Sequence, residues 1–410
     1  MHKLTFVGAA VAALCASHAS PAAAAEPAGG TSDALNIKPI LDARLRFEEV
    51  DQGALDGDAL TIRLRAGAEA KLGRLSLLGE AEGTFAPVDN YNAFPFPIDD
   101  RQRRPQYATI PDPENLELNR LQLQYKAGGN VVTAGRQRIN LDDQRWVGSV
   151  GWRQNEQTFD AVRGEFKVGP ASADVTHAIS QRTIFGEGAG PRTAYDGHFL
   201  FAGLGSKIGP VQAKLFSYLL DYDESFFLAN SSQTYGGIVS GAVPLGGKTQ
   251  LSLRASYARQ SDYKQNPFDY SADYWNLEGG VTVAGFTVLG GWEKLGSDNG
   301  RAVQTPMATL HKFNGWADLF LTTPAAGLED AYVTLSRKFD GVKLLPGLTA
   351  SVTFHQFDSA TGGIDYGSEW DASVGFKVGK VGLLVKYADY DADEFGADTR
   401  KMWLQAEWAF

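Results

Sequence analysis

The stretch Asp398–Phe410, DTRKMWLQAEWAF, decides how the rest of the chain is interpreted. Every second residue from Met402 to Phe410 is apolar, and the residues between them and beside them are Lys401, Trp403, Gln405, Glu407 and Ala409. Such a strand presents one face to an apolar environment and the other to water. An amphipathic strand that ends on an aromatic residue is typical of the closing strand of an outer-membrane β-barrel. The sequence therefore predicts that one face of the chain meets a lipid bilayer.

The opposite end of the chain predicts export. Residues 1–25 contain a basic start at His2 and Lys3, an apolar stretch over 4–16 and a small-residue finish that ends at Ala25. This pattern predicts a secretory signal that is cleaved near Ala25. We expect residues 26–35 to form a short periplasmic segment and residues 36–410 to form the barrel. The single cysteine, Cys15, lies inside the signal, so the mature chain has no disulfide framework.

In the chain after the signal, apolar and polar residues alternate, and long apolar runs are absent from the sequence. No run of 18 apolar residues follows the signal, so membrane helices are not expected, and strands in hydrocarbon must close into a barrel to pair their backbone groups. The clearest alternation covers residues 59–72, where Leu60, Ile62 and Leu64 alternate with Thr61, Arg63 and Arg65. A slip of one residue would turn the arginines toward lipid, at about 2–4 kcal/mol each.

The connections between the alternating segments predict the number of strands. Short turns are expected at 72–74, 128–129, 168–170, 208–210, 244–247, 284–285, 340–346 and 378–381. Longer connections are expected at 51–58, 87–115, 141–157, 182–196, 222–232, 260–272, 296–329, 358–368 and 391–398. The two sets alternate, as short periplasmic turns and long outer loops do in such barrels. They predict an antiparallel up-and-down barrel of about 18 strands, with 16 strands, a soluble sandwich or a solenoid as alternatives. The strand over 131–139 fits least well, because placing Arg136 and Arg138 inside leaves Thr133 and Gln137 outside.

Three stretches resemble the alginate-export family of outer-membrane barrels. They are GRQRINLDDQRWVGSVGWRQNEQTFDAVR at Gly135–Arg163, TPMATLHKFNGWADLFLTTPAAGLEDA at Thr305–Ala331, and DYDADEFGADTRKMWLQAEWAF at Asp389–Phe410. The resemblance implies an 18-stranded barrel in the outer membrane, and the type member of the family passes an anionic polysaccharide through a lumen lined by arginines. It also implies a role for Arg136, Arg138 and Arg145, which match the basic residues of the family motif.

The alternation itself places a set of arginines in the predicted lumen. With Arg145 from the motif, the candidate substrate path consists of Arg46, Arg63, Arg65, Arg120, Arg136, Arg138, Arg145, Arg163 and Arg254, and Arg44 faces the same way. Guanidinium groups stay charged and bind carboxylates bidentately, and a row of moderate sites lets an anion enter and leave. The alternative is a set of ion pairs within the wall, because the same faces carry Asp42, Glu48, Glu69, Glu80, Glu82 and Glu165.

Two long loops are candidate gates. Loop 87–115 carries Arg101, Arg103 and Arg104, and loop 296–329 carries His311 and Lys312. The alternative for both is a solvated loop that contacts lipopolysaccharide. Near another outer turn, four carboxylates form a weak candidate calcium site, although their spacing is not that of an EF-hand loop and a solvated acidic turn is the alternative: Asp389, Asp391, Asp393 and Glu394. No other metal or cofactor is expected.

The expected function is a passive outer-membrane channel for an anionic polysaccharide or oligosaccharide. The alternatives are a general porin or one selective for other sugars or anions, an outer-membrane hydrolase, and an adhesin or scaffold. The sequence has no G-x-S-x-G or H-E-x-x-H motif, which disfavours a hydrolase. The net charge of −10 argues against nucleic acid as a partner. Expected partners are outer-membrane lipid, lipopolysaccharide, the saccharide and periplasmic export or uptake proteins. A closed barrel needs no second subunit, so a monomer is expected.

Overall fold

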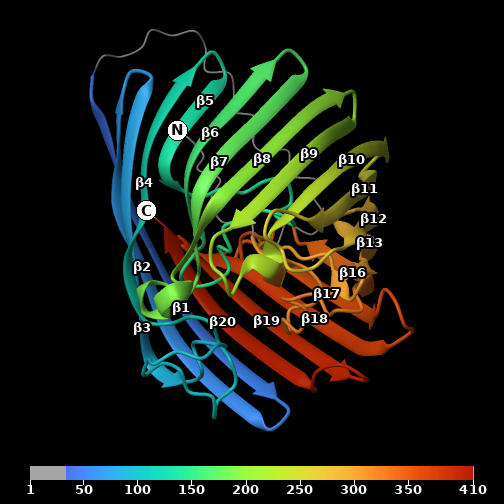
Figure 1. Cartoon of the computed structure of the whole chain (residues 1–410). Helices are drawn as coiled ribbons and strands as arrows, with labels where there is room; N and C mark the ends of the chain where they lie inside the picture. The colour runs from blue at the N-terminus through green and yellow to red at the C-terminus, as the bar shows by residue number, and fades with distance from the viewer. Residues whose placement is uncertain (1–33, 410) are drawn as a thin grey trace.

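Eighteen antiparallel strands form one closed sheet in the computed structural model, which describes residues 34–409 (Figure 1). The strands of the barrel are β1 (Asn36–Gln52), β2 (Leu55–Leu72), β3 (Leu75–Asn90), β4 (Asn115–Ala127), β5 (Asn130–Gln137), β6 (Thr158–Val168), β7 (Ala171–Arg182), β8 (Ala194–Ile208), β9 (Val211–Tyr222), β10 (Ser232–Gly246), β11 (Thr249–Asp262), β12 (Ser271–Val283), β13 (Phe286–Leu295), β16 (Leu328–Lys338), β17 (Thr349–Asp358), β18 (Asp365–Val378), β19 (Val381–Ala392) and β20 (Thr399–Ala409). The predicted signal at 1–25, most of the predicted segment 26–35 and the terminal Phe410 lie outside the described residues.

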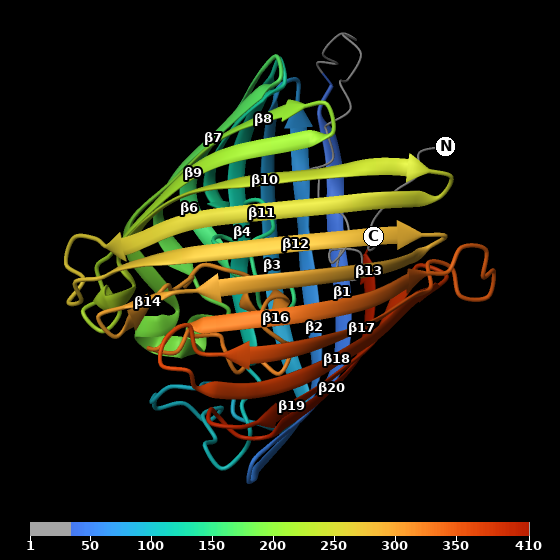
Figure 2. The same cartoon turned by 90° about the vertical axis from the view of Figure 1, so that its right-hand side faces the viewer.

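The first and last strands close the barrel. Phe47 of β1 is the register partner of Leu404 of β20, and Arg46 is the partner of Gln405. Figure 2 shows the strands following one another around the wall, with the short turns at one end and the long loops at the other. Within residues 34–409, no helix is long and apolar enough to cross a membrane. The predicted fold and strand number are confirmed.

The alternation on the strands sorts side chains between lipid and lumen as expected. On β2, Arg63 is fully buried inside the barrel, whereas its neighbour Leu64 exposes 54% of its surface on the outside. On β20, Lys401 and Trp403 lie inside, and Leu404 lies outside. Because side chains alternate strictly along a strand, these positions fix the register of the closing strands.

One predicted long connection is a tight turn. The polar and glycine-rich residues 51–58 predict a loop, but β1 continues to Gln52 and β2 begins at Leu55, so two residues join the strands. Gln52 and Leu55 are register partners, and Gly53 has a φ of 60°, a value that glycine adopts at little cost. A polar composition does not distinguish a loop from a hairpin whose strands extend beyond the bilayer into water.

The prediction that Arg136 faces the lumen is wrong. Its register partners are Leu121 of β4 and Asp160 of β6, and Leu121 is exposed on the outer surface. Thr133 and Gln137 are the buried residues of β5 and face inward. Asp160 makes the outward position of Arg136 tolerable, because it accepts bonds of 2.8 Å from both Nε and Nη2 of the guanidinium.

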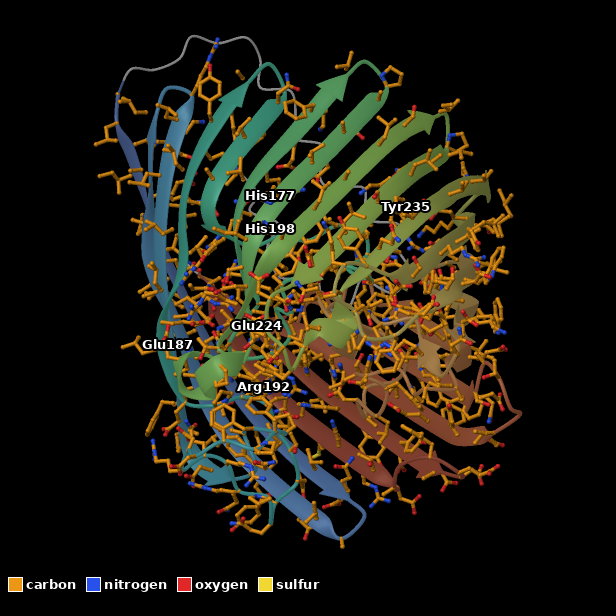
Figure 3. All side chains as sticks on the ribbon, in the orientation of Figure 1. His177, Glu187, Arg192, His198, Glu224 and Tyr235 are labelled. Atoms are coloured by element: carbon orange, nitrogen blue, oxygen red, sulfur yellow. The ribbon has the colours of Figure 1, made fainter. Side chains whose placement is uncertain are left out.

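The long loops contain the remaining regular structure. These pieces are the 3₁₀ helices η2 (Glu187–Arg192), η3 (Leu228–Asn230) and η4 (Leu310–Lys312) and the small hairpin of β14 (Ser297–Asp298) and β15 (Arg301–Ala302). In Figure 3, Glu187, Arg192 and Glu224 lie toward the loop end of the barrel, whereas His177, His198 and Tyr235 lie on its wall. Loops of this length at one end of the barrel are typical of the extracellular side.

Candidate functional site: a plug held between two lumen walls

Two long loops enter the lumen and bind each other. Loop 138–157 follows β5, and loop 303–327 precedes β16. An isolated bridge pairs Val147 with Met307, and the N–H of Gly148 donates to the carbonyl of Met307 at 2.8 Å. Val147 and Met307 are almost completely buried in one cluster with lumen-facing aromatic residues of the wall, which include Phe159, Phe201, Phe216, Tyr218 and Tyr274. We term the two loops together the plug, because they narrow the lumen at this level.

Arginines on one side of the lumen bind carbonyl groups of the plug. We term this side the arginine wall, which consists of Arg44, Arg46, Arg63 and Arg65 on β1 and β2. Nη1 of Arg44 donates to the carbonyls of Gly151, Trp152 and Arg153 at 3.0–3.1 Å. Nη2 of Arg46 donates to the carbonyl of Trp152 at 2.5 Å, and its guanidinium lies 4.0 Å from the centre of the Trp152 ring. The wall thus supplies donors to loop backbone that has no strand partner.

The same arginines are paired with carboxylates. Arg44 binds Glu407 of β20 at 3.0 Å, and Arg63 binds Asp42 and also Glu407, at 3.2 Å. Arg65 binds Glu82 and, at 3.3 Å, Glu156 of the plug. The alternative that the sequence left open, ion pairs within the wall of the lumen, is therefore present at the arginine wall. Burial raises the pKa of Glu156, but Arg138 and Arg65 outweigh burial and lower it to about 2.

Carboxylates on another part of the lumen wall bind amide groups of the plug. We term this part the carboxylate wall, which consists of Glu293 on β13, Asp330 on β16, and Glu369 and Asp371 on β18. Glu369 accepts the N–H of Ala317 at 2.8 Å, and Asp371 accepts that of Trp316 at 3.2 Å. The side-chain amide of Asn314 donates to Glu293 at 2.7 Å and to Asp330 at 3.2 Å. Sequence reasoning missed this wall, although Glu369 and Asp371 stand two residues apart on one face of a predicted strand.

His311 lies where the two loops and the two walls meet. Its Nδ1 lies 2.8 Å from Asp318, and its Nε2 lies 2.7 Å from Nζ of Lys386 on β19. When Lys386 is protonated, its ammonium group can only donate, so Nε2 of His311 accepts, the ring proton is on Nδ1, and both contacts require a neutral ring. Trp152 stacks on this ring with centroids 4.5 Å apart. Burial lowers the pKa of His311 well below its usual 6.5, and the attraction of Asp318 does not restore it.

Four predicted arginines keep part of their side chain exposed to the lumen. The exposed fractions are 16% for Arg120, 29% for Arg138, 16% for Arg163 and 19% for Arg254. Each one already binds a carboxylate: Arg120 and Arg138 bind Glu80 at 2.6 and 3.2 Å, Arg163 binds Asp174 at 2.9 Å, and Arg254 binds Asp143 at 2.5 Å. We term these four residues the exposed arginines. Each of these guanidinium groups is therefore placed to bind a carboxylate.

Arg145 differs from the exposed arginines, because the plug buries it. It binds Glu293 at 3.0 Å and the side-chain oxygen of Asn314 at 3.1 Å. Its own N–H donates to the side chain of Asp143 at 3.2 Å, so Asp143 forms a turn through its side chain. Lys312 also lies within the plug and donates to the carbonyl of Asp143 at 2.8 Å. His311, Lys312 and Arg145 are therefore parts of one assembly.

The three arginines predicted for the other gating loop bind their own surroundings. Arg101 pairs with Glu114 at 2.5 Å, Arg103 donates to the carbonyl of Phe96 at 3.1 Å, and Arg104 pairs with Asp89 at 2.5 Å. Loop 91–114 packs as a separate apolar cluster on β1, β2 and β3. Near its end, Asp112 is buried and lies 3.5 Å from Arg46. The structure thus brings one carboxylate of this loop to the plug, and not its arginines.

The weak calcium candidate is not assembled. Asp389 lies 3.6 Å from Arg400, and the part of the chain that the structure describes contains no group of three or more histidine, cysteine or carboxylate side chains that could hold a metal ion.

His177 and His198 stack on the outer face with centroids 5.8 Å apart, and Figure 3 labels both residues on the wall of the barrel. His355 lies inside, 2.9 Å from Asp330.

The family model for alginate export matches residues 58–303 of this barrel. The chain belongs to the alginate export family. Among curated protein sequences, none matches it. In this family member, the matched residues include most of β2, all of β3 to β13, loop 138–157 and all four exposed arginines.

Solved structures with the same fold are outer-membrane proteins of low sequence identity. OpdO of Pseudomonas aeruginosa is 13% identical with a TM-score of 0.69, over 92% of this chain and 97% of that one. OccAB4 of Acinetobacter baumannii is 12% identical with a TM-score of 0.70, over 91% and 98%. OpdK of Pseudomonas aeruginosa, solved with vanillate, is 14% identical with a TM-score of 0.68, over 91% and 98%. The fold and the family place this protein in the outer membrane as a channel-type barrel.

Proposed function

We propose that this family member is a passive channel for an anionic polysaccharide or oligosaccharide such as an alginate-like uronate chain. The observation that carries the proposal is the set of exposed arginines, each of which keeps part of its side chain exposed to the lumen while it binds a carboxylate. A guanidinium that accommodates the carboxylate of Glu or Asp also fits that of a uronate. Membership of the alginate export family supports the same substrate class.

Exchange of carboxylate partners gives the transport a physical mechanism. A uronate that approaches Arg163 replaces Asp174, which remains partly exposed to water. The charge on the guanidinium is then compensated throughout, so no step leaves a bare ion in the lumen. The affinity of each site for the chain is set by the difference in free energy between the contact of the arginine with the uronate and its contact with its own carboxylate partner. This weak preference lets the polymer leave one site for the next.

The plug must move before a polymer can pass. Loops 138–157 and 303–327 are bonded to both walls, and residues such as Val147 and Met307 are almost without exposed surface. A thin chain therefore needs a state in which bonds from the plug to at least one wall are broken. We propose a gating role for His311 and Lys312 within the plug, and a direction of flow that follows the concentration gradient.

A porin for small anions is the second candidate function. The narrowed lumen favours it, and OpdK, a structural neighbour, was solved with a small aromatic carboxylate, vanillate. The two functions differ in the size of what passes. In a liposome-swelling assay with uronate monomers, trimers and long chains, a small-anion porin admits the monomer and excludes the long chain. A polysaccharide channel admits all three.

The direct test is conductance in planar bilayers with a uronate trimer. We expect anion preference in a salt gradient, and block of the current by the trimer. The double variant R163Q/R254Q should weaken the block by about tenfold, the loss expected for charge-assisted contacts. The matched control is R136Q/D160N, which removes the same ion-pair chemistry from the outer face. Equal block in wild type and in R163Q/R254Q would contradict the assignment of the path.

A further inference from the structure

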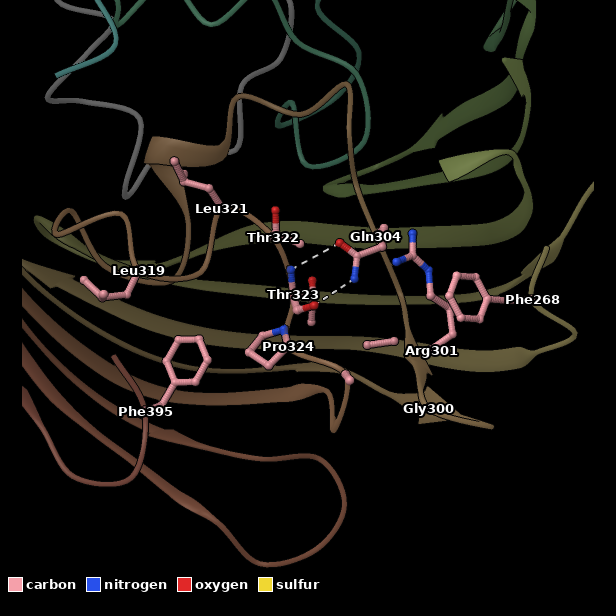
Figure 4. A pocket seen from close by; sticks show the side chains of 12 residues that line it. Phe268, Gly300, Arg301, Gln304, Leu319, Leu321, Thr322, Thr323, Pro324 and Phe395 are labelled. Carbon is pink, nitrogen blue, oxygen red and sulfur yellow. Dashed lines mark hydrogen bonds between the residues drawn. The ribbon is translucent and has the colours of Figure 1, made fainter. Parts of the chain in front are cut away.

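A cavity of about 640 Å³ opens among the long loops, between loop 303–327 of the plug and two neighbouring loops (Figure 4). Its lining comes from three connections that are far apart in the sequence: Phe268 in the loop after β11, residues 300–325 before β16, and Phe395 in the loop after β19. This volume falls within the range of about 300–1,000 Å³ that small-molecule sites occupy. The cavity is therefore large enough for a sugar residue.

Arg301, in the lining, has only neutral partners. Its Nη2 donates to the carbonyl of Ala229 at 2.6 Å and to the side-chain oxygen of Asn230 at 3.1 Å. Its Nε is buried and has no hydrogen-bond partner. Within residues 34–409, no carboxylate lies within 4.0 Å of this guanidinium, whereas each of the exposed arginines of the lumen has one. The cavity thus contains a charge that the protein leaves uncompensated.

The surroundings of Arg301 are largely apolar. Its guanidinium lies 5.3 Å from the centre of the Phe268 ring, which is 41% exposed, and Phe395 lines the opposite part of the cavity. Gln304 fixes the lining segment, because its side chain accepts the N–H of Thr323 at 3.2 Å and donates to the carbonyl of Thr323 at 2.9 Å, as Figure 4 shows. A preorganised pocket loses little entropy when a ligand binds.

We propose that this cavity is an extracellular docking site for one uronate unit of an anionic saccharide, with the carboxylate on Arg301 and the ring against Phe268. A guanidinium without a counter-ion gains more from a carboxylate than one that must first release a partner. The C–H face of a pyranose fits an aromatic side chain, and the hydroxyl groups can reach the polar edge formed by Thr322 and Thr323. The site rests on the proposed function, since it gives the saccharide a place at the outer mouth of the channel.

The test compares the two sides of a bilayer that holds the full-length protein. A uronate trimer added on the extracellular side should block the current of R301Q about tenfold more weakly than that of wild type, the loss expected for one charge-assisted contact. Block from the periplasmic side should be unchanged. R301K, which keeps the charge but not the planar fork, should be weakened by less. The matched control is K264Q, a neighbouring loop lysine outside the cavity lining.

Calorimetric titration of the detergent-solubilised protein separates this site from the transport function. Wild type should bind the uronate trimer, F268A and R301Q should bind it more weakly, and a neutral trisaccharide of the same length should not bind. Binding that depends on Arg301, without any block of current, would retain the site and reject the channel function proposed above. Unchanged affinity in R301Q would overturn the site, as would inorganic phosphate that competes as well as the trimer does.

Discussion

The arginine wall and the carboxylate wall hold the same plug with opposite chemistry. Arg44 and Arg46 donate to carbonyl oxygens of loop 138–157, whereas Glu369 and Asp371 accept N–H groups of loop 303–327. Buried backbone groups need partners, and a loop inside a barrel has no neighbouring strand to supply them. The two walls supply the partners that a strand would give, donors on one side and acceptors on the other.

The walls differ in how they compensate their own charge. Each arginine of the arginine wall has a carboxylate within bonding distance, and most of these carboxylates belong to the neighbouring strands of the barrel. On the carboxylate wall, Glu293 is paired with Arg145 of the plug at 3.0 Å, and Glu369 and Asp371 accept N–H groups of the plug. The arginine wall is therefore a structural part of the barrel, while the carboxylate wall depends more on contacts with the plug. Release of the plug should begin at the carboxylate wall.

The largest effect is expected from Arg63, on the arginine wall. It is fully buried and bonded to both Asp42 and Glu407, so R63M leaves Asp42 without its cation and Glu407 with Arg44 alone. The barrel should lose about 3–5 kcal/mol of unfolding free energy. Urea titration of the protein refolded into liposomes measures the loss. R63M/D42N, which keeps Glu407 as the partner of Arg44, should recover most of it, and a loss below about 1 kcal/mol in R63M would contradict a structural role.

The position of Arg63 was predictable from the sequence, and its partners were not. Alternation fixes which face a residue occupies, so β2 and β20 could be placed from the pattern alone. Arg136 was misplaced because β5 has few apolar residues, and its phase depends on Asp160, a residue of another strand. The plug was also beyond prediction in detail, because loop 138–157 is positioned by contacts with β1 and with loop 303–327 and not by its own sequence pattern. Resemblance to a family identified the loop, and only the fold showed what holds it.

The next effect should come from the carboxylate wall and appear in gating, not in stability. E369Q/D371N replaces the two carboxyl groups that accept loop N–H groups, and each of these hydrogen bonds is worth about 0.5–3 kcal/mol to the closed plug. Single-channel recording should show longer open times than in wild type, while urea stability of the barrel changes by less than about 1 kcal/mol. If the open times of E369Q/D371N equal those of wild type, release of the plug does not begin at the carboxylate wall.

Acidification should open the channel through His311, which stands between the walls. The charged groups that face it are Asp318, Lys386 and Arg153, and burial keeps its pKa in the closed plug well below 6.5. A depressed pKa stabilises the closed plug fully above about pH 6.5 and progressively less as pH falls below that value. The ratio of open to closed channels should rise by up to about tenfold per pH unit between pH 6.5 and 5. H311Q should remove the pH dependence of this ratio. Channels that open when the pH is raised would contradict a gating role of His311.

The smallest effect is expected from Arg136, which belongs to neither wall. Its guanidinium faces outward and is 21% exposed, and its partner Asp160 is 31% exposed. Removal of an ion pair so placed should change the unfolding free energy by less than about 1 kcal/mol. R136Q/D160N should also keep the reversal potential of wild type in a salt gradient, because no lumen charge is lost. A shift in anion preference as large as that of R163Q/R254Q would mean that Arg136 and Asp160 contribute to the substrate path. The lumen would then contain a third charged wall beside the arginine wall and the carboxylate wall.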